Sequence, residues 1–536
     1  MEIRRNLNLI PGKKWLELKP YKQLTSYDHY YIKLASRLLA EFKKLPPFLT
    51  PDTRMQNPTE VLALVLTSYL EDIVNEIGIW RAFTEANQKQ LGYYLPFIEE
   101  DEEAYEPGVF DYRDLCYLIW HFLNQNEDTL FVPKSPMVES IADTAWNVLE
   151  PALEDAPETD FYREYLSLTE DMHFFEVKER LHWFGLKAYP LYFEFGPRLN
   201  TDYRDLIEKN KSFADQGEVL YHLMDEYAFS NPSTYCALTT PQWLAAVTGV
   251  SQEMGQQMFN LRYRLAGNFE YQSSTADHHI VRPVHHSEVV LVSKDSATIP
   301  SSTKKGDWIL MALVSFQGKI MVSGMLAILG ELSEREKQDL PPIQFPFSMK
   351  SEAEQTLSWE MIEEHEIDFR AEFGDLVYVP RDSADLQSHM KSFWIRSINR
   401  SNARQEKADV SPPTPEKIAR LMQHVPDAPD TATAFVPGEG MLFEPGAGRI
   451  LQLLREPSLT DVKLIGKLFG GLVAELHPVV MDYFLQQVPD TPVWFPVKGI
   501  PYNTRPYLAF FSRYHQPENY LPRVPNVTVV KESEDS

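Results

Sequence analysis

The segment Asn57–Phe83, NPTEVLALVLTSYLEDIVNEIGIWRAF, determines the fold class of the N-terminal half of the chain. Asn57-Pro58 joins a helix-capping residue to a proline at the first helical position. Apolar side chains then recur at helical spacing, at Leu62, Leu66, Tyr69, Ile73, Ile77 and Trp80. This pattern predicts one long helix at the centre of a helical body.

The segments on either side of this helix also carry helix start signals. Thr25-Ser-Tyr-Asp28 has the form of a capping box ahead of an apolar helical face. Further helices are expected at 111–124, where Asp111 and Asp114 form a capping pair, at 136–150 and at about 161–185. Together they predict a helical N-terminal domain over residues 1–235.

The pattern changes to short strands near residue 267. Five β-rich runs, 268–272, 279–284, 289–292, 308–316 and 319–326, are separated by polar turns, and Gln317-Gly318 joins the last two as a hairpin. Residues 236–330 are therefore predicted to hold a short helix pair and a small five-stranded β module. The expected fold is mainly α with an embedded β-barrel-like module, α+β overall and multidomain.

The C-terminal part is predicted to be mostly helical again. Residues 331–402 are expected to form a helical or mixed segment with one short strand at 376–379, and the proline-rich stretch 403–415 is expected to be a linker. Residues 416–487 have a helical pattern. The end of the chain, within 416–536, is rich in prolines and aromatic residues, which predicts a segment that wraps over the body rather than a disordered tail.

Composition narrows the class of protein. Acidic residues outnumber basic ones by 77 to 51, and the formal net charge of −26 repels nucleic-acid phosphates. Cys116 and Cys236 are too few for a disulfide framework or a thiolate metal site. No stretch reaches the roughly 18 apolar residues of a membrane-spanning helix. These features predict an acidic, cytoplasmic protein with no membrane partner and no cofactor, and they disfavour a nucleic-acid partner.

Complete catalytic motifs are missing from the sequence, so polar residues on the predicted helices are the best candidates for a catalytic site. Glu71 and Asp72 lie on the central helix, and Asp114 and His121 lie on the helix at 111–124. If these helices pack together, the four side chains could line one pocket of a metal-assisted hydrolase. The alternative is that Asp114 serves as a helix cap and that His121, beside Trp120, is a core histidine.

Four histidines in the β region are the nearest approach to a metal site. His278-His279 and His285-His286 flank a short extended run. His279 and His285 would lie about 20 Å apart along an extended strand, which is too far for one metal ion unless the chain reverses between them. Histidines on an edge of the small sheet are the favoured interpretation.

Residues 242–264 have some features of a DNA-binding helix-turn-helix. Gly249 stands at the expected turn, and Arg262 and Arg264 could contact phosphates. However, Gly255 occupies a position where a branched apolar residue normally packs, and the second helix carries no positive charge. Two short helices beside the β module are the preferred interpretation, and a DNA-binding regulator stays an alternative.

Several of these segments also resemble a known family. The motifs, in chain order, are Trp15-Leu-Glu-Leu-Lys-Pro-Tyr21, Tyr69-Leu-Glu-Asp-Ile73, Gly78-Ile-Trp80, Tyr94-Leu-Pro-Phe97 and Asp114-Leu115 running to Trp120-His121. They resemble the uncharacterised, Bacteroidetes-type domain-of-unknown-function family 3843, and residues 294–324 look like its β region. The resemblance implies a bacterial origin but no activity and no catalytic residue.

The function that these observations favour is a cytoplasmic protein-binding or scaffold protein with one or more protein partners. A hydrolase with a site near Glu71, Asp72 and His121 and a DNA-binding regulator acting through residues 242–264 are the two alternatives. The sequence does not identify the partner.

Overall fold

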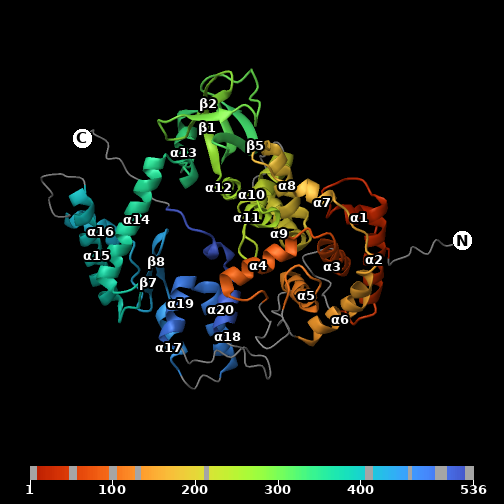
Figure 1. Ribbon diagram of the computed structural model, residues 1–536. Helices are drawn as coiled ribbons and strands as arrows, with labels where there is room; N and C mark the ends of the chain where they lie inside the picture. Colours follow the sequence, from red (N-terminus) through yellow and green to blue (C-terminus); the bar gives the residue numbers. More distant parts are fainter. Residues whose placement is uncertain are drawn as a thin grey trace. The chain divides into compact units, whose positions relative to one another are not determined.

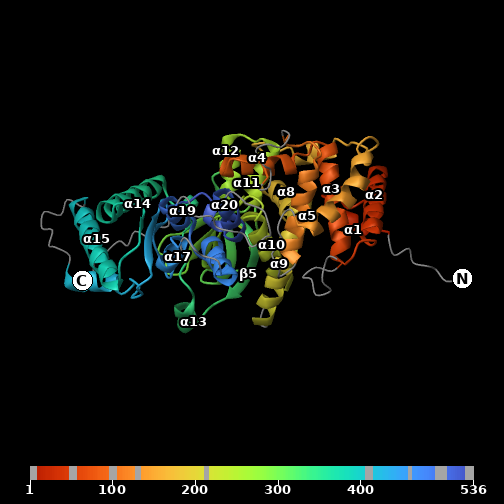
Figure 2. The same cartoon turned by 90° about the horizontal axis from the view of Figure 1, so that it is seen from below.

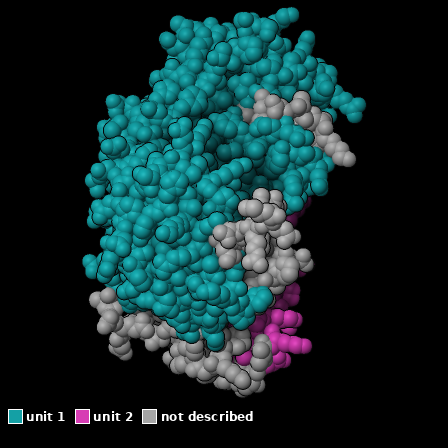
Figure 3. Space-filling view, turned by 90° about the vertical axis from the view of Figure 1, so that its right-hand side faces the viewer, with its two compact units in different colours: residues 1–344 teal, residues 345–536 magenta. Residues whose placement is uncertain are grey.

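The computed structural model describes residues 9–47, 57–95, 105–126, 135–209, 216–343, 345–404, 414–456, 461–488 and 504–525. The chain divides into two compact units, residues 1–344 (unit 1) and 345–536 (unit 2), and each is described by itself (Figures 1 and 3). The domain boundaries predicted at residues 235, 330 and 402 stay predictions. None of the described helices is long and apolar enough to cross a membrane.

Unit 1 begins with a helical body. Its elements are α1 Gly12–Leu16, α2 Ser26–Phe42, α3 Pro58–Val74, α4 Ile79–Leu91, α5 Tyr112–Asn126, α6 Pro136–Leu149, the 3-10 turn η1 Glu150–Ala152, α7 Phe161–Leu166, α8 Phe174–Lys187, α9 Tyr189–Lys209, α10 Gln216–Phe229, α11 Thr240–Thr248 and α12 Gln252–Asn260. The capping box predicted at Thr25 and Asp28 is present at the start of α2. Fully buried tryptophans, Trp80 and Trp120 among them, lie in the core of this body.

The predicted central helix is wrong beyond Val74, because the chain breaks there and starts a second helix. Glu76 and Gly78 adopt positive φ angles of 49° and 89°. The side chain of Asp72 accepts hydrogen bonds from the backbone N–H groups of Gly78 at 2.8 Å and Trp80 at 2.8 Å. Since these N–H groups belong to the unsatisfied first turn of α4, Asp72 caps that helix from the preceding one.

The helix predicted over 161–185 is likewise two helices, α7 and α8. A short irregular segment, 167–173, separates them. His173 starts α8, and its side chain and that of Glu176 form a reciprocal capping box. The apolar periodicity therefore continues across the break between α7 and α8. The capping pair His173 and Glu176 marks where the second helix begins.

The five predicted strands form the β module of unit 1. They are β1 Leu265–Ser274, β2 His278–Pro283, β3 Val290–Ser293, β4 Trp308–Phe316 and β5 Lys319–Gly330, and α13 Glu334–Asp339 follows. The strands pair in the order β1-β2-β3-β5-β4, and β1 also pairs with β4. A single parallel residue pair, Val292 with Ile320, joins β3 to β5. Because unit 1 combines a helical body with this mixed sheet, the predicted α+β class is confirmed.

Helices and strands of unit 1 meet along two elements. α12 packs beside β4. α10 lies beside β5 (Figures 1 and 2). Met254 and Met258 of α12 are buried, so this helix is attached to the module by its apolar face. The two short helices predicted here are α11 and α12, and α12 is the one that packs beside β4.

Two helical glycines of unit 1 should respond oppositely to substitution. A Cβ at Gly185 of α8 would lie 2.8 Å from Thr240 Oγ1 and 3.3 Å from Ala228 Cα. We expect Gly185→Ala to destabilise the protein by about 1–3 kcal/mol, because neighbouring backbone must shift.

The matched control is Gly255→Ala in α12, where the nearest atom to a Cβ would be Val250 Cγ2 at 3.9 Å. At this position the higher helix propensity of alanine should stabilise the protein by about 0.5–1 kcal/mol. Urea unfolding midpoints measure both changes. Equal effects at the two positions would contradict the close helix packing at Gly185.

Unit 2 contains a small sheet that the sequence did not reveal. Its elements are the 3-10 turn η2 Phe347–Met349, α14 Glu352–Phe373, β6 Val377–Tyr378, α15 Ser383–Arg404, α16 Pro415–Met422, β7 Ala432–Val436, β8 Gly440–Glu444, α17 Ala447–Leu454, α18 Val462–Gly470, the π-helical turn η3 Gly471–Glu475, α19 Pro478–Gln487, α20 Thr504–His515 and the 3-10 turn η4 Pro517–Tyr520. The strand predicted near 376–379 is β6. However, β7 and β8 interrupt the segment predicted to be helical over 416–487, and the three strands pair in the order β6-β7-β8.

Two predictions for unit 2 fall largely on residues outside the described ranges. Residues 405–413 of the expected linker and residues 489–503 of the expected aromatic wrapping segment are among them. In the described part of that segment, Phe510, Phe511 and Tyr514 belong to α20 and are buried. This part of the aromatic end is therefore a packed helix.

Candidate functional site

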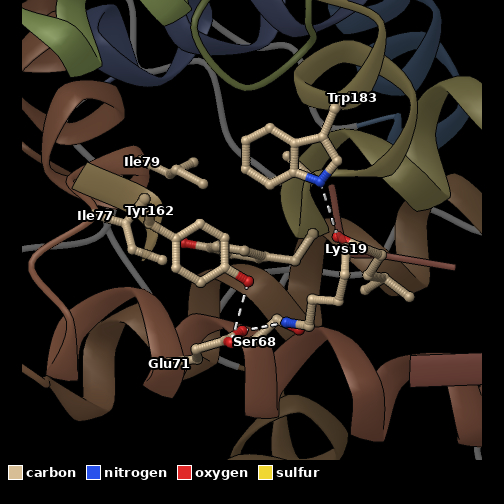
Figure 4. Close-up of a pocket in the computed structure, with 10 residues that line it drawn as sticks. Lys19, Ser68, Glu71, Ile77, Ile79, Tyr162 and Trp183 are labelled. Atoms are coloured by element: carbon tan, nitrogen blue, oxygen red, sulfur yellow. Dashed lines mark hydrogen bonds and ion pairs between the residues drawn. The ribbon is translucent and has the colours of Figure 1, made fainter. Parts of the chain in front are cut away.

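Glu71, the first of the four predicted polar residues, forms a buried ion pair with Lys19. The two side chains are each 2% exposed. Tyr27 and Tyr162 donate hydrogen bonds to Glu71 Oε1 at 3.0 Å and 3.1 Å, and Figure 4 shows Tyr162 and Lys19 pointing at the same carboxylate. Burial lowers the pKa of Lys19, against the opposing effect of Glu71.

A small cavity lies beside this ion pair. It is lined by Lys19, Ser68, Glu71, Ile77, Ile79, Tyr162, Trp183 and three other residues, Leu18, Ala188 and Tyr189. The space for the centres of water-sized molecules is about 10 Å³, which is the volume that one water needs. Ser68 Oγ has no hydrogen-bond partner in the described part of the chain. The arrangement accommodates a water-sized molecule next to a charged pair.

Asp72 faces different partners from its neighbour Glu71. Besides the N–H groups that begin α4, it accepts a hydrogen bond from Tyr189 Oη at 2.9 Å. Burial raises the pKa of Asp72 to about 6, although these hydrogen bonds oppose the rise. Asp72 therefore acts as the cap of α4, and its hydrogen bond from Tyr189 connects this cap to α9.

Asp114 points into the core instead of capping its own helix. Tyr69 and Tyr105 donate hydrogen bonds to its two carboxylate oxygens at 2.5 Å and 2.8 Å. Asp111 is the residue whose side chain accepts from the start of α5, through the Arg113 N–H at 2.7 Å. Burial raises the pKa of Asp114 to about 7. The predicted capping pair is therefore wrong for Asp114.

His121 is a core histidine, as the alternative interpretation expected. Its Nε2 lies 2.8 Å from Thr234 Oγ1, and its ring stacks on Tyr235 with centroids 3.6 Å apart. Burial keeps the pKa of His121 well below its usual value. Each of the four candidates thus has its own set of partners. No group of three or more His, Cys, Asp or Glu side chains in the described residues could hold a metal ion.

The raised pKa of Asp114 gives a pH-dependent prediction. Its folded-state pKa of about 7 exceeds the ordinary value of 3.8, so the folded protein holds a proton that the unfolded chain releases. Stability from this group is present at low pH and is lost as pH rises through about 7. Relative to Asp114→Asn, the wild-type protein should lose up to about 1.4 kcal/mol per pH unit between about pH 4 and 7. Urea unfolding at several pH values measures this difference, and parallel profiles for the two proteins would contradict it.

Three of the four histidines of the β module have separate side-chain partners. His285 Nε2 and His286 Nε2 lie 3.1 Å and 2.6 Å from the backbone oxygens of Leu340 and Ile343. His279 is buried, with Nδ1 2.9 Å from Ser274 Oγ. His285 and His286 therefore hold the segment that follows α13, and His278–His286 do not converge.

The helix pair at 242–264 does not present its two arginines on a common exposed rim. The guanidinium of Arg262 stacks on the rings of Phe259 and Tyr263, 4.6 Å from each centroid. Arg264 turns towards α10, where its Nη2 lies 3.0 Å from His222 Nδ1. A DNA-binding surface would need these side chains to face phosphates.

The structure brings together a polar cluster that sequence reasoning missed. It is centred on Asp225 of α10, whose side chain is fully buried. Lys178 Nζ and His182 Nε2, both from α8, lie 2.8 Å and 2.6 Å from its oxygens, and Ser323 of β5 donates to it as well. Burial opposes the charge of Asp225, but the hydrogen bond from His182 and the charge of Lys178 outweigh it and lower its pKa to about 2.

A second group of polar atoms lies next to Asp225. Gly324 of β5 has a φ of 85°, and a Cβ there would lie 3.0 Å from Arg264 Nη2, 3.3 Å from His222 Nδ1 and 3.4 Å from Asp225 Oδ2. Burial and the nearby Arg264 lower the pKa of His222 to about 4, so its imidazole is neutral at pH 7. The sequence contains one signal of this group: Gly324 lies inside a predicted strand, and a glycine there indicates that other groups approach the backbone closely.

Comparison with known proteins gives one match. The family DUF3843, described as a protein of unknown function, matches residues 9–262. This match spans the helical body through α12 and confirms the resemblance; the β region lies outside it. Neither a curated protein nor a solved structure matches the chain.

Proposed function

We propose, on the premise that residues 9–262 belong to the family DUF3843, that the chain is a bacterial, cytoplasmic protein-binding or scaffold protein. Its binding surface would be strand β3 of the β module, and its partner an extended segment of another protein. The observation that carries this proposal is the pair of exposed apolar side chains on that strand. Val289, directly before β3, and Leu291 are each 51% exposed.

These side chains form part of one apolar face. Val289 and Leu291 alternate with the buried Val290 and Val292, so both point outwards. On the neighbouring strand β2, Ile280 is paired directly with Leu291 and is only partly buried. A cross-strand apolar pair that faces solvent is typical of a surface that another protein covers.

The backbone of β3 supports the same interpretation. β3 pairs with β2 at each of its four residues, from His278–Ser293 to Val281–Val290. Towards β5, the described residues have only the pair Val292–Ile320. The pairing order returns to β1, which supports a small barrel whose weakest junction is this one. A strand edge with few ladder partners is a template for an added strand.

Two further features are consistent with the proposed partner and compartment. The net charge of −26 favours a partner segment that carries lysine or arginine beside its apolar residues. Cys116 and Cys236 are not joined in a disulfide, as expected in a reducing cytoplasm.

The test is co-purification from the native cells with a charge placed on the proposed surface. Val289→Glu/Leu291→Glu should reduce recovery of a stoichiometric partner at least tenfold relative to wild type. The matched control is Val109→Glu, since Val109 is 48% exposed in the helical body. Unchanged recovery in the β3 variant, or no protein enriched above a tag-only sample, would overturn the proposal.

A further inference from the structure

We infer that the β module carries a binding surface for a proline-rich segment of a partner protein, and that the chain's own residues 340–343 (the strap) occupy this surface. The strap has the sequence Leu-Pro-Pro-Ile and follows α13. The surface consists of His285 and His286, in the turn after β2, and of Gly267 of β1. It does not include the exposed face of β3, so the inference does not depend on the proposed function.

The sequence of the strap fixes an extended backbone. Leu340 has φ and ψ angles of −70° and 136°, which are those of a polyproline II helix. Pro341 and Pro342 have φ angles held at about −65° by their rings. Leu340 and Pro341 each precede a proline, which confines them to the extended region. The strap therefore loses little conformational entropy when it docks.

Two histidine side chains contact the backbone of the strap. His285 Nε2 donates to the carbonyl oxygen of Leu340 at 3.1 Å, and His286 Nε2 donates to that of Ile343 at 2.6 Å. A polyproline II helix has three residues per turn, so carbonyl groups three residues apart lie on one face of it. Rings that line one face of an extended turn are the means by which many domains bind proline-rich segments.

The backbone at His285 lets both rings reach the strap. Side chains of neighbouring residues in an extended strand point to opposite faces. His285 instead has a positive φ of 60°, which is uncommon for a non-glycine residue and breaks this alternation. Residues held in such conformations are concentrated at functional sites and ligand clamps. The turn after β2 is therefore shaped to hold an extended segment.

Ile343 provides the apolar contact. Its side chain is 6% exposed and lies against the backbone of Gly267, where a Cβ would be only 2.7 Å from Ile343 Cγ1 and Cδ1. Pro341 and Pro342 are exposed. The surface thus contacts two backbone oxygens and one branched aliphatic side chain. A partner segment with two prolines followed by such a residue offers the same groups.

The strap is weakly anchored by the helix before it, because α13 contains no buried residue. A segment held by two hydrogen bonds and one apolar side chain opens locally at a low free-energy cost. Because the strap is tethered, it competes with an external segment at an effective concentration on the order of 1 mM. The surface is therefore open to a partner only when the strap is released.

The test is binding of a fluorescent peptide with the sequence of residues 337–346, KQDLPPIQFP, to the full chain, measured by anisotropy. Ile343→Asp, which releases the strap, should bind the peptide at least tenfold more tightly than the wild type. If Ile343→Asp fails to fold, Pro341→Gly/Pro342→Gly, at exposed positions, should bind it about fivefold more tightly, because the strap loses its preorganisation. No binding to the released variant, or equal binding to it and to the wild type, would overturn the inference.

Further variants test whether the peptide binds at this surface. In the released variant, adding His286→Phe keeps a ring but removes the donor, and should weaken peptide binding at least tenfold. The matched control is His278→Phe, a partly exposed histidine of the same module, which should leave binding unchanged. A peptide with alanine at both proline positions should bind at least fivefold more weakly. Equal binding by the two histidine variants, or of the two peptides, would refute recognition of a proline-rich segment here.

Discussion

Replacing Glu71 by glutamine should destabilise the protein by about 3–5 kcal/mol, because the substitution leaves the Lys19 ammonium buried without its counter-charge. Lys19 and Glu71 are each 2% exposed, and Lys19 Nζ lies 3.6 Å from the ring centroid of Trp15. The ammonium cannot reach bulk solvent without opening the packing around α1 and α3. Urea unfolding of the purified variant at pH 7 measures the loss.

Two comparisons separate this prediction from a general sensitivity of the fold. Glu41→Gln removes an exposed ion pair with Lys44, whose side chains are 40% and 67% exposed, and should cost less than about 1 kcal/mol. The double variant Lys19→Met/Glu71→Leu removes both buried charges and should be more stable than Glu71→Gln. If Lys19→Met/Glu71→Leu is less stable than both Glu71→Gln and Glu41→Gln, the prediction is wrong, and the pair stabilises the fold by more than mutual charge compensation.

Replacing Asp225 by asparagine should cost a similar amount, about 3–5 kcal/mol, because Lys178 is then left as an uncompensated buried cation. Asp225 also joins α8, α10 and β5 through His182 and Ser323. We therefore expect the attachment of the β module to the helical body to loosen. Hydrogen exchange should show the largest change in β5 and α10.

The sign of the pH dependence gives a second check on Asp225. Its pKa of about 2 lies below the ordinary value of 3.8, so its stabilising effect is present above about pH 4 and is lost as pH falls through about 2. Asp295→Asn is the control, since the side chains of Asp295 and Lys319 are 51% and 55% exposed. Its effect on stability should be far smaller than that of Asp225→Asn. Equal effects of the two substitutions would contradict a special role for Asp225.

The parts of the fold that the sequence predicted correctly depend on local signals. The capping box of Thr25 and Asp28 spans four consecutive residues, and the Gln317-Gly318 turn joins β4 to β5 directly. In contrast, the break after α3 depends on Asp72 reaching backbone groups of the next helix. The apolar period of α3 continues through Ile77, within the break, and Trp80, after it, so periodicity alone could not reveal the break.

The candidate site was harder to predict because its contacts are distant in sequence. Glu71 was singled out, but its partner Lys19 lies 52 residues away. Asp225 and Ser323 are 98 residues apart, and no spacing rule relates them. A polar side chain on a helix face looks the same in the sequence whether it meets solvent, a tyrosine or a buried lysine. Only the packing of the helices decides between these environments.

Site-specific photo-crosslinking from position 291 tests the proposed function most directly. Benzoylphenylalanine in place of Leu291 should, on irradiation of the native cells, give one covalent adduct with a partner protein. The same residue in place of Val109, which is 48% exposed, should give no such adduct. An adduct that is absent from position 291, or that forms equally from both positions, would contradict binding at β3.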